Sequence, residues 1–335
     1  MTSVSVIIEW KNQDLAADER ADAMLDALRK QWIELASGAT TPEHSNLAAT
    51  SIPPCLEILF VYDGLAARKN LETQLGNRFD SPTRAFATQL IDGVGLSYYE
   101  MKHRGAERAA GDILIFLDSD VVPQPGWLAA LLDAVLDPQV QAVCGNTYVD
   151  PVGLLGKAFA LAWFFPLRSN ETGLRERAKC YSNNFAMNAR LYRDYPFIEV
   201  PGTTRAAMGQ LTARLAEQGI EVYKCHEAQV SHPCPRGLRH FLMRAIVHGR
   251  DIYLKVNHDA GRAPAARRIG DVLGEVWARY TSGLKRTFRA HRQVDLAGVA
   301  VPLVMAIITL YYLVFAAGSL ATHLAPAPMS RGLRI

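Results

Sequence analysis

The sequence has few of the features that would assign it quickly to a class of proteins. Its five cysteines are an odd number at wide spacing, which argues against a disulfide framework and favours reduced thiols. The pairs Cys225-His226 and His232-Pro233-Cys234 fit no standard zinc module. Lys and Arg number 36 against 33 Asp and Glu, so the net charge of +3 gives no reason to expect a nucleic acid as partner.

Other common signals are missing as well. The sequence has no internal repeat and no low-complexity tract, and it opens without a basic start or a cleavage-site pattern, so no signal peptide is expected. Residues 9–13, which follow the expected first strand, form neither the glycine-rich basic loop of a nucleotidyltransferase nor a G-x-G-x-x-G dinucleotide fingerprint. A nucleotidyltransferase and an NAD-dependent enzyme therefore remain only as weaker alternatives.

The most informative feature is a pair of acids that follows an apolar run. Residues 113–117 are all apolar, and Asp118 and Asp120 come directly afterwards. Such a run, with Pro123 and Pro125 beyond it, predicts a buried strand that ends at the acids. Carboxylates at the carboxyl end of a strand lie where open α/β sheets bind ligands, and their oxygens suit Mg2+ or Mn2+ bridging to phosphate. The alternative is an ordinary turn at a strand end, where Asp-Ser is common.

Strands and helices are expected to alternate over the first half of the chain. The apolar patterns predict strands at 4–9, 56–64, 113–118 and 140–148, and helices at 14–35, within 65–90, at 100–110 and at 127–136. Residues 37–54 are rich in Ser, Thr, Pro and Asn, which indicates a surface loop. This alternation predicts an α/β protein with a doubly wound, mostly parallel sheet.

The pattern is looser after Pro151. It predicts helices at 154–165, 211–218 and 239–256, and strand pieces at 221–224 and 228–230. One face of the helix at 239–256 carries polar and basic residues at four- and three-residue spacing: His240, Arg244, His248, Asp251 and Lys255. This face either rests on anionic lipid headgroups or is the solvated side of a helix at the domain edge.

One segment near the C-terminal end is long enough to cross a membrane. No residue from 296 to 322 carries a formal charge, and about 27 residues suffice to span a bilayer with some tilt. Lys and Arg crowd the segment 258–295 before it, which is typical of the cytoplasmic side. The sequence therefore predicts a transmembrane helix at 296–322 and a tail at 323–335, with the preceding domain in the cytoplasm. The alternative is a very apolar buried helix.

The acids at the expected strand ends, with the residues around them, resemble the family 2 glycosyltransferases, which have the GT-A fold. The resemblance is carried by Val4–Ile8 with Asn12, by 58–64, by 105–120 and by 123–128, and it covers roughly residues 3–257. It implies a GT-A domain over 1–257, with a donor half at about 1–150 and an acceptor half at about 151–257. It also implies inverting transfer of a sugar from a UDP- or GDP-sugar to a lipid or glycan acceptor.

The resemblance implies roles for single residues. Asp63 would accept a hydrogen bond from the nucleobase, and Asp118 would lie near the ribose and the metal. Asp120 would bind the divalent cation, Mg2+ or Mn2+, and His232 resembles a position that approaches the metal or the diphosphate. Further candidates complete the set: Glu9 beside the nucleoside, Lys102 and Arg104 near the phosphates, and Asn183 and Asn184 on the acceptor side.

The sequence departs from the family where the catalytic base is expected. The family usually carries a Glu-Asp pair at the start of the acceptor-side helix, and this chain has Ala207 and Met208, neither of which can accept a proton. Either the correspondence is shifted by a few residues, or Glu199 or Glu171 is the base, or the acceptor is already ionised. The last alternative is a catalytically silent member that binds a nucleotide-sugar as a subunit or regulator. Glu199 is the preferred candidate because it directly precedes the expected helix.

Overall fold

The computed structural model describes most of the chain, and it divides the chain into two compact units. The described residues are 2–11, 18–38, 55–80, 85–176, 179–200, 203, 206–261 and 267–325. The first unit comprises residues 1–147, 169–198 and 207–232, and the second comprises 148–168, 199–206 and 233–335. Residues 233–257, which were expected to complete the first domain, thus belong to the second unit. Asn12, most of the expected loop at 37–54 and most of the tail lie outside the described residues.

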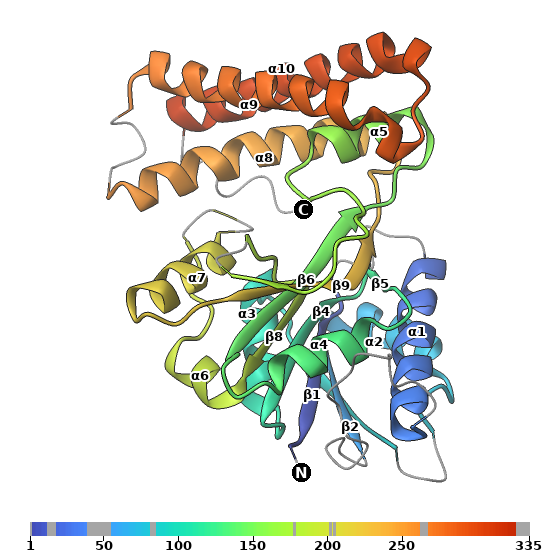
Figure 1. The fold of residues 1–335 in the computed structure, drawn as a ribbon. Coiled ribbons are helices and arrows are strands. Elements are labelled where there is room, and N and C mark those ends of the chain that lie inside the picture. Colours follow the sequence, from blue (N-terminus) through green and yellow to red (C-terminus); the bar gives the residue numbers. More distant parts are fainter. Residues whose placement is uncertain are drawn as a thin grey trace. The chain divides into compact units, whose positions relative to one another are not determined.

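The first unit is built on a mixed sheet, which has nine strands within the described part of the chain (Figure 1). Its main path runs β3 (Phe86–Asp92), β2 (Leu56–Tyr62), β1 (Val4–Glu9), β4 (Ile113–Asp118), β8 (Asn184–Asn188), β6 (Ala142–Val149), β9 (Tyr223–His232) and β5 (Val122–Pro123), with β7 (Leu174–Arg175) paired to β9. The first four strands on this path are parallel, whereas β8 runs antiparallel to β4. The expected α/β fold is confirmed, but the sheet is mixed, because the parallel part formed by β3, β2, β1 and β4 ends at β8.

The two central strands are buried on both faces, which explains why they read as continuous apolar runs. Along β1, Val6 and Ile8 point into one hydrophobic core and Ile7 points into the other. Along β4, the side chains alternate between the same two cores. A strand covered on both sides needs no polar positions, so its sequence shows no alternation.

Helices cover both faces of the sheet. The first core packs α1 (Asp18–Ala36) and α4 (Trp127–Val135) against the strands, and the second packs α3 (Tyr98–Arg108), α6 (Ala189–Asp194) and α7 (Ala207–Glu217). The start of α3 is fixed by a capping box, in which the Ser97 hydroxyl accepts from the Glu100 amide and the Glu100 carboxylate accepts from the Ser97 amide. This cap starts the helix two residues before the expected position.

Two features of the first unit differ from the sequence prediction. The expected helix within 65–90 is a shorter helix, α2 (Gly64–Leu75), followed by the strand β3. The side chains of β3 are exposed or half-buried, so the strand lacks the apolar alternation that reveals a strand in a sequence. In addition, Cys144 and Cys180 form a disulfide with a Cα–Cα distance of 5.6 Å. Cys144 lies in β6 and Cys180 lies four residues before β8, and 36 positions separate them in sequence.

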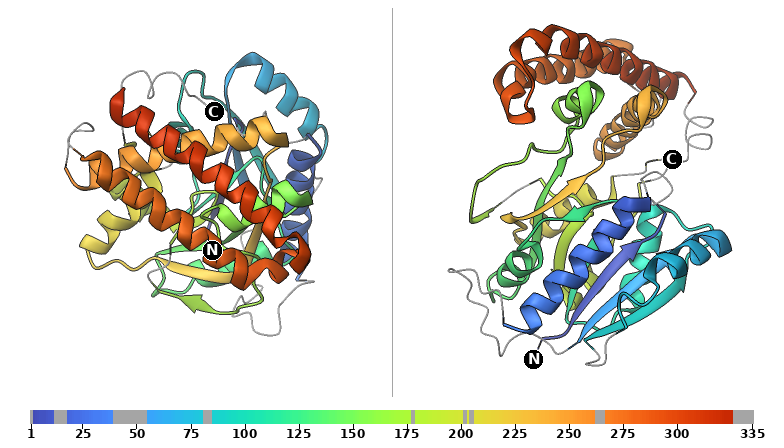
Figure 2. Two further views of the ribbon diagram at one scale, coloured as in Figure 1. Left: turned by 90° about the horizontal axis from the view of Figure 1, so that it is seen from above. Right: turned by 90° about the vertical axis from the view of Figure 1, so that its right-hand side faces the viewer.

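The second unit is a bundle of helices, α5 (Gly153–Ala162), α8 (Gly237–Asp259), α9 (Ile269–Ala290) and α10 (Val301–Leu324), with two short 3-10 turns before α10 (Figure 2). The α8 and α10 backbones touch, because a Cβ at Gly249 would clash with the Phe315 carbonyl oxygen and one at Gly318 with that of Ile246. The helix α9 was not predicted, since its segment was read only as a basic stretch.

Two predictions about the second unit are refined by the structure. A helical segment at Gly298–Leu324 is long and apolar enough to cross a membrane, and it starts two residues later than expected. The polar face predicted for residues 239–256 is not an open surface. Arg244, His248 and Asp251 are at most 9% exposed, whereas His240 and Lys255 are half-buried. The middle of that face is therefore neither solvated nor available to lipid headgroups.

Candidate functional site

Three carboxylates gather in the interior of the first unit at the carboxyl ends of β1 and β4. Glu9 stands beside Asp118 in the parallel register of these strands, and Asp120 follows two residues later. Their exposed fractions are 0%, 4% and 1%, respectively. Burial raises the pKa of Glu9 well above its usual value, and the nearby Asp118 and Asp120 raise it further. Three carboxyl groups thus lie together where water is scarce, and their surroundings favour the protonated form of Glu9.

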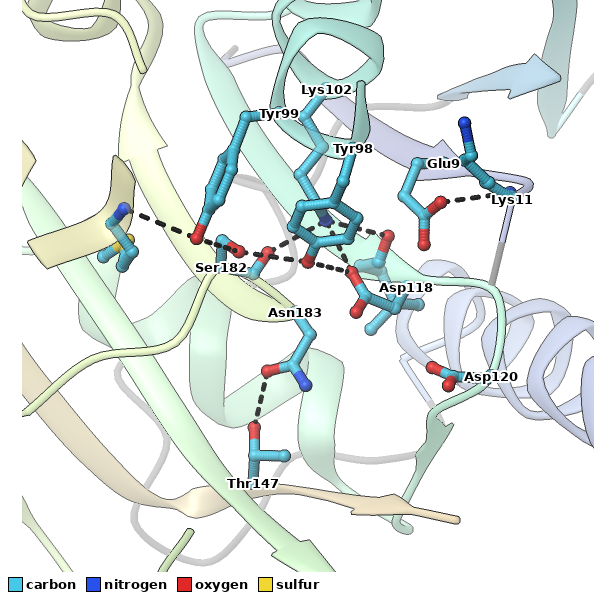
Figure 3. A network of polar contacts seen from close by, with 12 residues as sticks. Glu9, Lys11, Tyr98, Tyr99, Lys102, Asp118, Asp120, Thr147, Ser182 and Asn183 are labelled. Atoms are coloured by element: carbon cyan, nitrogen blue, oxygen red, sulfur yellow. Dashed lines mark hydrogen bonds and ion pairs between the residues drawn. The ribbon is translucent and has the colours of Figure 1, made fainter. Parts of the chain in front are cut away.

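Lys102 neutralises part of this charge (Figure 3). Its ammonium lies 2.7 Å from an Asp118 oxygen, and it also donates to the Ser182 carbonyl oxygen at 3.0 Å. The Tyr98 hydroxyl donates to the same Asp118 oxygen at 2.7 Å, and burial together with that carboxylate raises the pKa of Tyr98. Lys102 is fully buried, so its ammonium is held in this pair and fixes the position of the Asp118 carboxylate.

The other acid of the motif lies close to His232. The His232 Nε2 atom is 3.7 Å from an Asp120 carboxylate oxygen, and both side chains are at least 90% buried. Arg20 links the two segments that carry them, since it donates to the Asp120 carbonyl oxygen at 2.6 Å and to the Ser231 carbonyl oxygen at 2.5 Å. It also donates to the Ser231 hydroxyl. The guanidinium thus fixes the backbone on either side of a candidate ligand pair.

Asp63 lies at the end of β2 and is kept ionised by its neighbours. The Lys11 ammonium is 3.0 Å from one carboxylate oxygen, and the Gly95 amide donates to the other at 3.2 Å. Partial burial opposes ionisation, but these hydrogen bonds outweigh it and lower the pKa of Asp63. The Lys11 amide also donates to the Glu9 carboxylate at 3.0 Å. One residue therefore connects the ends of β1 and β2, and Asp63 is available as a charged acceptor.

The two asparagines expected on the acceptor side have different surroundings. Asn184 is fully buried, accepts from the Trp127 indole at 2.8 Å and donates to the Ala228 carbonyl oxygen at 2.8 Å. Its amide thus ties α4 to β9. Asn183 lies on the side of Asp118 and accepts from the Thr147 hydroxyl at 3.0 Å (Figure 3). Of the two, Asn183 is the better placed for a ligand.

Three more candidates lie apart from this network. Arg104 is on the exposed side of α3, where its guanidinium lies 3.5 Å from the Glu107 carboxylate. Glu171 is exposed and pairs with His226 at 3.0 Å. Glu199 is half-buried and belongs to the second unit, so its role as the base stays a prediction.

Sequence reasoning missed three residues of the site, namely Lys11, Arg20 and Tyr98. Tyr98 and Lys102 are four residues apart on one helix, and this spacing places both on the side that faces Asp118. That spacing was a usable signal. Arg20 gave none, because its partners lie 100 and 211 positions away in sequence.

The residues present fit a divalent cation held together with a phosphate ligand. Among the described residues, no group of three or more His, Cys, Asp or Glu side chains forms a complete metal cage. Asp120 and His232 offer one carboxylate and one imidazole side by side. Mg2+ and Mn2+ sites of nucleotide enzymes commonly use one or two protein ligands and complete the shell with phosphate oxygens and water. The donor set therefore suits a metal that binds along with its substrate.

Comparison with known families assigns this part of the chain. Residues 101–197, which include α3, the two acids and β8, match the model of glycosyl transferase family 2. This segment of the chain is thus similar to the family 2 glycosyltransferases. The match agrees with the resemblance seen in the sequence and favours it over a nucleotidyltransferase or a dinucleotide-dependent enzyme.

A curated relative and two solved structures are similar to this chain. The glucosyl-dolichyl phosphate glucuronosyltransferase of Haloferax volcanii is 29% identical over 135 residues, which cover 39% of this chain and 42% of the relative. The mannosyltransferase PcManGT of Pyrobaculum calidifontis, solved with GDP-Man and Mn2+, has a TM-score of 0.56 at 13% identity, covering 97% of this chain and 88% of its own. GalNAc-T7 with UDP, GalNAc and Mn2+ has a TM-score of 0.50 at 12% identity, covering 75% and 48%. The structural matches support the GT-A fold.

Proposed function

We propose that this protein is a metal-dependent, inverting glycosyltransferase that takes a sugar from a nucleoside-diphosphate sugar such as a UDP- or GDP-sugar. The observation that carries the proposal is the pair Asp118 and Asp120, buried at the end of a central parallel strand inside the matched family 2 segment. The structural relatives bound to GDP-Man or UDP together with Mn2+ support the same class of donor.

Each side chain of the site has a proposed task. Asp63, kept ionised by Lys11, accepts hydrogen bonds from the nucleobase, and Glu9 lies on the nucleoside side. Asp118, oriented by Lys102 and Tyr98, faces the ribose and the metal. Asp120 and His232 hold the cation, Mg2+ or Mn2+, which when bound stabilises the charge that develops on the departing diphosphate. Arg104, which lies on α3, is the remaining candidate to contact the phosphates of the donor.

The acceptor side is proposed with Glu199 as the general base and Asn183 as a ligand contact. An inverting transfer needs a group that removes the proton of the acceptor hydroxyl. One observation favours the second candidate function, a silent nucleotide-sugar-binding subunit. The start of α7 presents Ala207 and Met208, both at most 3% exposed, where the family usually has its acids.

The acceptor is proposed to be a lipid-linked sugar or lipid phosphate, with a glycan as the alternative. The apolar helix α10 supports attachment of the protein to a membrane, with the catalytic unit on the cytoplasmic side. The name of the Haloferax relative, which acts on a glucosyl-dolichyl phosphate, supports a lipid-linked acceptor.

The test is a transfer assay with membranes that contain the full chain, a panel of UDP- and GDP-sugars, and Mn2+ or a chelator. We expect Mn2+-dependent transfer to a lipid fraction and at least a hundredfold loss in Asp120→Asn. Asp26→Asn, which changes an exposed acid of α1, is the matched control and should be unchanged. Donor binding without transfer to any acceptor would leave the silent subunit as the function, and transfer that ignores Mn2+ and the Asp120 change would refute the metal role.

A further inference from the structure

The apolar helix α10 has charged neighbours at its middle. Its Tyr311 hydroxyl is 2.8 Å from the His248 ring nitrogen of α8, and its Thr309 hydroxyl is 3.0 Å from the Tyr280 hydroxyl of α9. A Cβ at Gly283 of α9 would lie 3.1 Å from the ring of Tyr312. The centre of α10 is therefore level with residues 248–249 of α8 and 280–283 of α9.

Ionisable side chains crowd these two levels. Arg250 and Asp251 of α8 form a buried pair at 2.9 Å directly beside the contact with α10. On α9, Arg279 pairs with Glu275, and Arg286 donates to the carbonyl oxygens of Trp163 and Phe165, which follow α5. If α10 crossed a bilayer in this packing, these charges would lie near the centre of the hydrocarbon layer. Charged groups are rare and costly there, because no water solvates them.

The outward side of the same helices has the opposite character. On α10, Leu303, Leu310 and Leu313 are exposed by 53%, 40% and 64%, and their spacing places them in one stripe. On α9, Trp277 and Phe288 are exposed by 66% and 62%. Figure 2 draws α9 and α10 as one layer of the helical unit, with α5 and α8 beneath it.

Basic residues accompany the aromatic stripe of α9. Lys285 and Arg289 are exposed on the turns around Phe288, and the exposed Arg292 follows in the next turn. A helix that exposes large apolar side chains beside lysines and arginines is typical of segments that lie in the headgroup region of anionic bilayers. Charge complementarity and continuity with the apolar face of α10 both point to a lipid surface as the occupant.

We infer that α9 and α10 lie in the plane of the membrane and bind a single leaflet, so that α10 does not cross it. The apolar stripes contact the acyl region, Lys285, Arg289 and Arg292 contact anionic headgroups, and α8 stays on the protein side with its buried charges. This arrangement replaces the single span expected at 296–322. The inference rests on one part of the proposed function, namely that the protein is attached to a membrane through its helical unit.

The first test asks on which side of the membrane the two ends of α10 lie. Val299→Cys and Leu324→Cys place thiols at exposed positions at the two ends of the helix, and the parent chain reports the background from its own cysteines. Sealed spheroplasts of a bacterial expression host are treated with a membrane-impermeant maleimide before and after lysis. We expect neither end to react in sealed cells and both to react after lysis. A single end that reacts in sealed cells would overturn the inference while leaving membrane attachment intact.

The second test measures the depth of Trp277. The other four tryptophans, Trp10, Trp32, Trp127 and Trp163, are at most 2% exposed, so Trp277 should dominate quenching from outside. The full chain is reconstituted in anionic vesicles whose lipids carry bromine at a shallow or a deep acyl position. We expect stronger quenching by shallow bromine, and Trp277→Phe should abolish the difference. Stronger quenching by deep bromine, or none at all, would contradict the inference. A protein absent from the membrane fraction would instead refute the proposed attachment, and transfer activity in the same samples is scored separately.

Discussion

Replacing Lys102 by methionine tests whether the site is held together by a buried ion pair. The change keeps an unbranched side chain of similar length but removes the charge that lies 2.7 Å from Asp118. Asp118 would then be a buried carboxylate that keeps the Tyr98 hydroxyl but has lost its nearest cation. Breaking a buried pair by removing one partner costs about 3–5 kcal/mol. At about 2–4 °C per kcal/mol for a domain of this size, the melting temperature should fall by about 6–20 °C.

The measurement is thermal unfolding in detergent, followed by circular dichroism, with two comparison variants. Lys102→Met combined with Asp118→Asn removes both charges and should recover much of the loss, because no unpaired ion is left behind. Lys69→Met, at an exposed position of α2, should stay within about 0.5 kcal/mol of the parent. A loss below about 1 kcal/mol in the single variant, or a double variant no more stable than the single, would refute the reasoning.

Three further predictions concern the same unit and its proposed chemistry. Asn184→Ala leaves the Trp127 indole and the Ala228 carbonyl oxygen without their buried partner, so it should cost about 2–5 kcal/mol in the same melting assay; a cost near zero would show that the amide is dispensable. Arg20→Lys removes the guanidinium that donates to both the Asp120 and the Ser231 carbonyl oxygens. The Mn2+ concentration for half-maximal transfer should therefore rise by about 10–100-fold, with donor KM unchanged at saturating Mn2+. An unchanged Mn2+ requirement would leave Arg20 with a purely structural role. Glu199→Gln should lower transfer by at least about a hundredfold with donor affinity unchanged, and a loss of tenfold or less would assign the base elsewhere.

The parts of the fold that sequence reasoning predicted well are those in which burial alone determines the residue types. The strands β1 and β4 are covered on both faces, so their apolar runs were visible, and the acids that follow them had to lie at the same edge of the sheet. The strand β3 was missed because an exposed edge strand carries no such signature. The helix α9 was missed because its segment was read only as a basic stretch, although its residues follow a clear amphipathic pattern.

The site shows the same division between local and long-range information. Asp63, Asp118 and Asp120 could be read directly from strand ends, and the structure places each at the end of a strand or just beyond it. Other contacts join segments far apart in sequence. Lys102 forms an ion pair with Asp118, and Asn184 forms hydrogen bonds with Trp127 and Ala228. A residue type alone does not tell a ligand contact from a structural one.

The balance of charge in the interior gives the strongest physical reason to expect a cation in the mechanism. Glu9, Asp118 and Asp120 are buried together, and the buried ammonium of Lys102 pairs with Asp118. A nucleoside diphosphate would bring more negative charge to the same place, and like charges at low dielectric repel strongly. Positive charge that enters with such a donor would reduce this repulsion. Asp120 and His232 lie where that charge would be held, and Arg20 fixes the backbone beside both of them. We therefore expect the binding of a diphosphate donor to depend on a divalent cation.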